Sequence, residues 1–231
     1  MALRWMPPPS EKTLAMCLAL IAGYVDACGL RVFGTYVSFM SGNTTHTGVL
    51  LGRRQLVAAM PFLIAIVFFV GGSFVGVWLN HWAVRRPRQL LFTAVATLLG
   101  SMIVSMHYSI HPRIWIAMLA LAMGMMNTTL SQIESESVSL TFVTGNLSRI
   151  GRHLALALKS ALVEDADSSH AHLRHAFLLS SVWLAVLSGA VLSGTAVAYF
   201  PQWMLLPPFL LLMALAVMTG RRPSAARDSR P

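Results

Sequence analysis

The sequence predicts an all-α, polytopic membrane protein with about six transmembrane helices, and two observations carry this prediction. Of 231 residues, 56% are hydrophobic and 11% are charged, and the mean hydropathy is +0.66. A water-soluble domain of this length cannot cover so much apolar surface. In addition, residues 55–84, 89–112 and 175–220 contain no charged side chain. Each stretch can hold one or two spans of about 20 residues, which leaves little chain for a soluble catalytic domain.

The apolar runs place the six helices at about 13–30, 56–80, 89–108, 113–131, 174–200 and 203–219. Pro201 and the Pro207-Pro208 pair predict a short break or a kinked start for the last one. Leucine and isoleucine recur at helical spacing in residues 147–160, which predicts an amphipathic helix at the membrane surface. We expect residues 1–220 to form a single membrane domain and the basic residues 221–231 to be a disordered tail.

The net charge of +9 reflects short basic clusters at the ends of apolar runs, which is typical of membrane topology and not of nucleic-acid binding. Alternate segments between the predicted helices hold 13 and 4 Lys and Arg residues. The positive-inside rule then predicts a multi-pass protein with both termini in the cytoplasm. Arg31, Arg53 and Arg54 fall on the predicted outer side, and the segment between them is itself unusual.

That segment, residues 32–52, carries no formal charge but contains eight Ser, Thr, Asn and His side chains. It is too polar for a span that faces lipid and too apolar for a loop in water. Irregular backbone at membrane depth is tolerated only where protein buries it or where it lines a water-filled cavity. We therefore expect a re-entrant or broken-helix element.

This element has a counterpart about 103 residues later in the chain. Residues 39–43 (Phe-Met-Ser-Gly-Asn) match residues 142–146 (Phe-Val-Thr-Gly-Asn); upstream, Gly23 and Asp26 match Gly124 and Asn127; downstream, Gly71 and Gly76 match Gly189 and Gly194. Matches in the same order indicate two homologous halves, residues 13–110 and 113–220. Because each half holds three spans, an odd number, the second half must enter the membrane in the opposite orientation. The sequence therefore predicts an inverted 3+3 repeat, an arrangement that recurs in secondary transporters.

Residues 23–52 and 124–154 resemble the two signature regions of the YoaK-like bacterial membrane proteins, a family of unknown function. The likeness covers nearly all of residues 13–220, and Asp26 and the Gly-Asn positions are its most specific part. Ser41 stands where the family has threonine, which keeps the hydroxyl group. The resemblance implies an integral inner-membrane protein with about six helices and supplies no substrate and no reaction.

The Ser/Thr-Gly-Asn motif predicts either a ligand-binding helix start or a plain helix cap. Asn is a favoured N-cap, and a helix N-terminus carries free N–H groups and a partial positive charge that suit an anion. Asp26 is the strongest single candidate, because an acid within a span is expensive unless it binds a proton, a cation, a substrate amine or a partner such as Arg31. The candidate substrate-binding residues are Asp26, Ser41, Gly42, Asn43, Thr44, Asn127, Thr144, Gly145 and Asn146.

The linker before the fifth helix concentrates two acids and three histidines in residues 165–175 (Asp165, Asp167, His170, His172 and His175). Their spacing suits zinc or nickel, but a solvated linker has the same composition, and we predict no metal and no cofactor. Nucleophile-elbow, zinc-protease and P-loop motifs do not occur in the sequence, so we predict no enzyme.

Small residues follow the spacing of helix-packing motifs in the second and fifth predicted helices, at Gly72 and Gly76 and at Gly189 and Ser193. They are expected to pack the halves together, with homodimerisation as the alternative. The leading hypothesis is a small transporter or channel-like permease for a polar or anionic solute, coupled to protons through Asp26. The alternative is a non-transporting membrane scaffold or regulator.

Overall fold

The computed structural model describes residues 10–82, 86–105, 108, 110–131, 143–163 and 166–220, and all regular structure in these ranges is helical. The elements are α1 (Glu11–Phe33), α2 (Met40–Gly52), α3 (Leu56–Trp82), α4 (Pro87–Ser105), α5 (Pro112–Ser131), α6 (Val143–Leu162), α7 (Ala166–Tyr199), the 3₁₀ turn η2 (Pro201–Trp203) and α8 (Leu206–Thr219). The all-α prediction is confirmed for these ranges. The predicted tail at 221–231 lies outside the described residues.

Five segments of the described chain are long and apolar enough to cross a membrane: α1, α3, α4, α7 and the Pro201–Thr219 segment that contains α8. They coincide with five of the six predicted spans. The predicted span at 113–131 is α5, a helix of 20 residues that is not among these five. A multi-pass membrane protein is therefore supported, and the count of six spans stays a prediction.

The largest difference from the sequence-based boundaries lies in α6 and α7. The amphipathic segment 147–160 is helical as predicted, inside α6. The predicted linker at 165–175 is wrong as a linker for its described part, because α7 already begins at Ala166. The extra turns pack along α6, where the Ser169 hydroxyl donates to the Ala157 carbonyl at 3.0 Å. Tertiary packing stabilises a stretch whose Ser, Asp and His residues have modest helix propensity.

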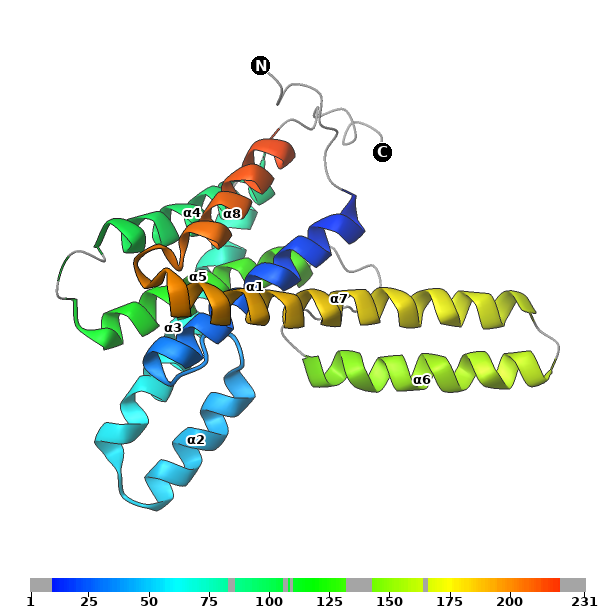
Figure 1. Ribbon diagram of the computed structural model, residues 1–231, viewed down its shortest axis with the longest axis horizontal. Helices are drawn as coiled ribbons and strands as arrows, with labels where there is room; N and C mark the ends of the chain where they lie inside the picture. Colours follow the sequence, from blue (N-terminus) through cyan, green and yellow to red (C-terminus); the bar gives the residue numbers. More distant parts are fainter. Residues whose placement is uncertain are drawn as a thin grey trace.

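The helices pack in pairs that join the two halves of the chain. Helix α1 lies along α7, α3 along α5, and α4 along α8. Helices α2 and α6 double back on α3 and α7, and the two resulting hairpins project from the bundle in different directions (Figure 1). Each of the three main pairs thus takes one helix from residues 13–110 and one from residues 113–220.

Glycines let two of these pairs touch backbone to backbone. A Cβ on any of four glycines would fall closer than 3.0 Å to the partner helix's backbone: Gly23 on Val186 and Gly189 on Leu20 where α1 meets α7, and Gly72 on Leu121 and Gly124 on Phe69 where α3 meets α5. Small residues have this role at membrane helix interfaces. The prediction that the small-residue faces pack the halves together is confirmed at Gly72 and Gly189.

The buried core lies between α1, α4, α5 and α8, whereas the outer helices expose large apolar side chains. Leu18, Phe92 and Leu119 have no exposed surface, but Phe74 on α3 and Phe177 on α7 are 66% and 75% exposed. Such exposure in water would favour aggregation, and in a bilayer it is satisfied by lipid.

Candidate functional site

The candidate site is built around a break in the helical chain between α1 and α2. Helix α1 ends at Phe33 and is capped by Gly34, whose φ of 66° is left-handed and suits glycine, and whose N–H donates back to the carbonyls of Gly29 and Leu30. Residues 34–39 are non-helical and fold back against the end of α1, where Thr35 and Val37 are 1% and 0% exposed. The predicted broken element at 32–52 therefore consists of the end of α1, this break and α2.

Asp26 of α1 fixes the break to the helix that precedes it. Its Oδ1 accepts hydrogen bonds from the backbone N–H groups of Val37 at 2.8 Å and Ser38 at 2.7 Å. These two donors have no helical carbonyl to bind, and a carboxylate is the strongest acceptor a side chain offers. Asp26 therefore lies beside the break, its observed partners are backbone groups of the break, and its role in binding a substrate stays a prediction.

Asn43 fixes the break from the other side, and not in the manner predicted. Phe39 is the N-cap of α2 and makes no side-chain cap hydrogen bond, while Asn43 is the fourth residue of the helix. The N-cap interpretation of Asn43 is therefore wrong. Its Nδ2 instead donates to the Tyr36 carbonyl at 2.7 Å, so the amide holds the middle of the break.

A pair of buried polar atoms remains next to the break. Asn43 and Thr47 are 0% and 7% exposed, and they lie one turn apart on the same face of α2. The Asn43 Oδ1 and the Thr47 Oγ1 have no hydrogen-bond partner among the described residues. A buried polar atom without a partner costs about 1–3 kcal/mol, so this pair marks a place for a polar ligand or water.

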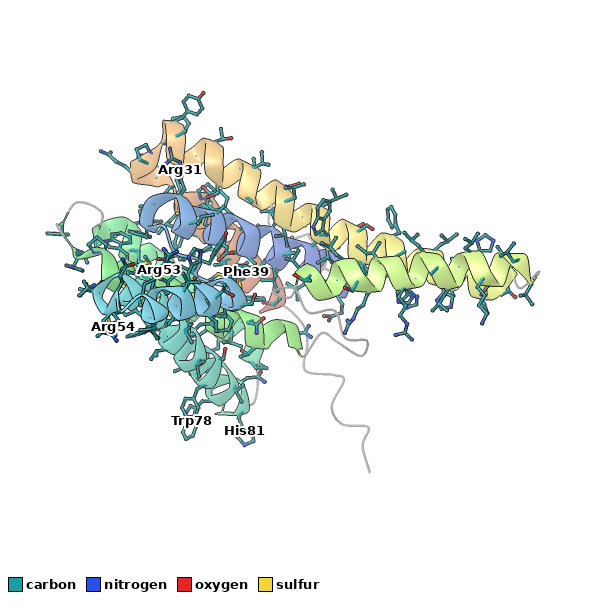
Figure 2. The ribbon with its side chains drawn as sticks, turned by 90° about the horizontal axis from the view of Figure 1, so that it is seen from below. Arg31, Phe39, Arg53, Arg54, Trp78 and His81 are labelled. Carbon is teal, nitrogen blue, oxygen red and sulfur yellow. The ribbon has the colours of Figure 1, made fainter. Side chains whose placement is uncertain are left out.

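The other predicted residues of the first motif have different surroundings. Gly42 is needed because a Cβ there would overlap the ring of Phe39, which lies at the start of α2 (Figure 2). Ser41 and Thr44 are exposed, and the Thr44 hydroxyl donates to the Met40 carbonyl within the helix at 2.8 Å. Asn43 is therefore the one residue of the Ser-Gly-Asn-Thr run that belongs to the buried polar pair.

The second copy of the motif lies on a different hairpin. Asn146 is the fourth residue of α6 and 3% exposed, Gly145 is half-buried and Thr144 is exposed. Asn127 is half-buried in α5. The segment between α5 and α6, which contains the matching residues 137–142, lies outside the described residues. Helix α2 packs on α3 and α6 packs on α7, on separate hairpins (Figure 1). Convergence of the two Gly-Asn elements therefore stays a prediction.

Two of the three histidines of the predicted metal-binding stretch contact a histidine that sequence reasoning missed. The His153 Nδ1 of α6 lies 3.1 Å from the His172 Nδ1 of α7, and the His153 ring stacks on His175 at 5.1 Å between centroids. Asp165 lies outside the described residues. Among the residues that the structure describes, no group of three or more His, Cys, Asp or Glu side chains is arranged to hold a metal ion.

Five apolar helices of bilayer length, with large side chains exposed on the outer faces, define a multi-pass α-helical membrane protein. The chain belongs to a family described as proteins of unknown function, DUF1275, whose model matches residues 14–218. It is similar to the UPF0700 transmembrane protein RA0705 of Rhizobium meliloti (strain 1021), at 31% identity over 216 residues that cover 90% of this chain and 87% of that protein. No solved structure matches the chain. The predicted membrane family of unknown function is confirmed, and the YoaK-like name stays a prediction.

Proposed function

We propose that this protein is a small permease for a polar or anionic solute, built from two inverted halves in the bacterial inner membrane with both termini cytoplasmic. The observation that carries the proposal is the buried, unpartnered pair of the Asn43 Oδ1 and the Thr47 Oγ1 beside a break in the helical chain. Inverted repeats of secondary transporters place their substrate sites at such broken helices near the membrane midplane.

Equivalent placement of the two asparagines supports the two inverted halves. Asn43 lies in α2 and Asn146 lies in α6, at the 103-residue offset of the sequence match. In both helices the asparagine is buried, and the residue two positions before it is exposed.

Reciprocal packing supports the same arrangement. The first helix of each half lies on the third helix of the other half: α1 on α7 and α5 on α3. The contacts correspond residue by residue, because Leu20 and Gly23 are each 101 residues before Leu121 and Gly124, while Phe69 and Gly72 are each 117 residues before Val186 and Gly189. These contacts favour Gly72 as the counterpart of Gly189, in place of Gly71, which the sequence match paired with it. A two-fold relation between halves predicts such an exchange of partners.

The break lies deep along α3. Arg53 and Arg54 mark one end of α3, and Trp78 and His81 mark the other (Figure 2). Helices α2 and α3 are antiparallel, and His46 stacks on Phe62 with 4.9 Å between ring centroids. Asn43 therefore lies about one turn deeper than His46, roughly 14 Å from the start of α3 at 1.5 Å per residue. That depth is about half of a hydrocarbon core of roughly 30 Å.

The chemistry of the pair favours a small solute with a hydrogen-bond donor. The Asn43 Oδ1 is an acceptor, and the Thr47 hydroxyl donates and accepts. The first turn of α2 has no side-chain cap. The Met40 and Asn43 N–H groups already donate to the Ser38 and Phe39 carbonyls, so the N–H groups of Ser41 and Gly42 are the ones that can serve a carboxylate or another anion. The site therefore suits a zwitterion or a polar anion better than an apolar compound.

The test compares Thr47→Val with Thr45→Val in proteoliposomes that are assayed with a panel of labelled amino acids, small carboxylates and polyols. Valine keeps the shape of threonine. Thr45 is exposed, and its hydroxyl donates to the Ser41 carbonyl, so Thr45→Val is the matched control. We expect Thr47→Val to lose most uptake and the control to retain it. Equal uptake by both variants, or no uptake of any panel member by the wild type, contradicts the proposal.

A non-transporting scaffold is the second candidate, and the bonding of Asp26 favours it. The carboxylate Oδ1 already accepts two backbone N–H groups, which is a structural role. Asp26→Asn keeps an oxygen acceptor and removes the charge. If protons are coupled to transport through Asp26, Asp26→Asn should lose uphill uptake. If the protein is a scaffold, Asp26→Asn should keep all properties of the wild type.

A further inference from the structure

A cleft of about 750 Å³ opens between the N-terminal parts of α1 and α7. Helices α1 and α7 run in the same general direction, cross near the middle of α1 and in the C-terminal half of α7, and diverge toward their N-termini (Figure 1). One wall carries Lys12 and Met16, which are one turn apart on α1. The other wall is the α7 face that includes His170, Arg174 and Phe177.

The cleft is basic at one end and apolar at the other. Lys12, His170 and Arg174 lie toward the N-terminal ends of the two helices, and Met16, Phe177 and Leu178 follow them further along both helices. No acidic side chain lines the cleft among the described residues. Glu11 neighbours Lys12 in sequence, but its carboxylate accepts from Arg88 of α4 at 2.8 Å. The two cations of the cleft therefore have no acidic partner within it.

The basic end lies at headgroup depth. Helix α7 has 34 residues, which is about 51 Å at 1.5 Å per residue, whereas the hydrocarbon core is roughly 30 Å thick. Its C-terminal part is the continuous apolar run, so the excess length is the N-terminal part that holds His170 and Arg174. Lys12 is the second residue of the span α1 and lies at the same end of the bundle. Phe177, 75% exposed, is about one turn further toward the hydrocarbon.

We propose that this cleft binds an anionic phospholipid, with the headgroup phosphate between Lys12 and Arg174 and an acyl chain along Met16 and Phe177. Basic pockets between transmembrane helices recognise anionic headgroups in this way, and an arginine guanidinium binds phosphate oxygens in a bidentate manner. Because its two cations come from two helices that belong to different halves of the sequence, the lipid holds α1 and α7 at the spacing of the cleft. The site is independent of the proposed permease site, which lies on α2.

The experiment measures the thermal stability of the full-length protein in uncharged detergent during titration with phosphatidylglycerol, phosphatidylcholine or glycerol 3-phosphate. The cleft variant is Lys12→Gln with Arg174→Gln. The control is Arg152→Gln with Lys159→Gln, which removes the same charge from exposed positions of α6. Phosphatidylglycerol is expected to raise the melting temperature of the wild type and of the control, and its affinity is expected to fall at least tenfold in the cleft variant.

Three results overturn the proposal. Equal phosphatidylglycerol affinity in the cleft and control variants means that the lipid binds elsewhere. Equal stabilisation by phosphatidylcholine means that the acyl chain alone is bound. Stabilisation by glycerol 3-phosphate at the same concentration means that the cleft is a site for soluble anions. Unliganded melting temperatures of the two variants within about 2 °C of each other verify that the comparison is between equally folded proteins.

Discussion

Alanine at Gly189 should separate two helices that now touch along their backbones. A Cβ there would fall closer than 3.0 Å to the Leu20 backbone, whereas ordinary contact begins at 3.4 Å. The new Cβ and the Leu20 backbone atoms cannot move aside as the end of a flexible side chain can, so α1 and α7 must move apart by roughly 1 Å. Overpacking of this kind costs about 1–3 kcal/mol.

The matched control is Gly194→Ala on the same helix, where a Cβ meets no described atom within 4 Å. Alanine is the better helix former by up to about 1 kcal/mol, so this change should be neutral or stabilising. After the same propensity gain, Gly189→Ala should remain destabilised by up to about 2 kcal/mol. For a chain of this length each kcal/mol shifts the melting temperature by about 2–4 °C.

The assay is thermal unfolding of both variants in one detergent, followed by tryptophan fluorescence. We expect Gly189→Ala to melt below the wild type and Gly194→Ala at or above it. The same melting temperature for the two variants would refute the close packing of α1 on α7. Gly72→Ala extends the test, because inverted halves predict a loss equal to that of Gly189→Ala within about 0.5 kcal/mol.

Two further changes test other contacts of the first half. Gly42→Ala should lower the melting temperature because its Cβ overlaps the Phe39 ring, whereas Gly48→Ala on the same helix meets nothing and should not; equal effects would contradict the packing of the break. Tyr24→Phe should cost about 1–2 kcal/mol in denaturant unfolding, because the buried Tyr24 hydroxyl donates to the Met204 carbonyl at 2.6 Å, and a loss below about 0.3 kcal/mol would show that this bond is not formed.

The spans were predictable because their signal is local. A run of about 20 apolar residues without charge is rare outside membranes. The predicted starts of two spans, at residues 56 and 89, fall within two residues of the starts of α3 and α4. The helical state of residues 166–173 was not predictable, because Ser, Asp and His have modest helix propensity and the packing on α6, seen at Ser169, is a tertiary contact. That contact joins two helices, and the hydrophobic pattern of the sequence does not indicate it.

The candidate site was half predictable. Asp26 and Asn43 were singled out because a charge in a span and an asparagine after glycine are uncommon, but the role given to Asn43 required a helix start that the chain places four residues earlier. Thr47 was missed, although its i+4 spacing from Asn43 puts both on one face of any helix through residue 43. The bond of Asn43 to Tyr36 depends on how residues 34–39 fold back, which depends in turn on Asp26.

The difference between Asp26 and Asn127 separates what folding needs from what a function would need. The break requires an acceptor for two N–H groups, and an amide oxygen meets that requirement as a carboxylate oxygen does. A carboxylate within a span carries a desolvation cost that an amide does not. Asp26→Asn should therefore be at least as stable as the wild type in thermal unfolding, while Asp26→Leu leaves two donors unpaired and should be destabilised by about 2 kcal/mol or more. If Asp26→Asn instead unfolds as readily as Asp26→Leu, the charge itself holds the break, and the case for a coupling role of Asp26 is lost.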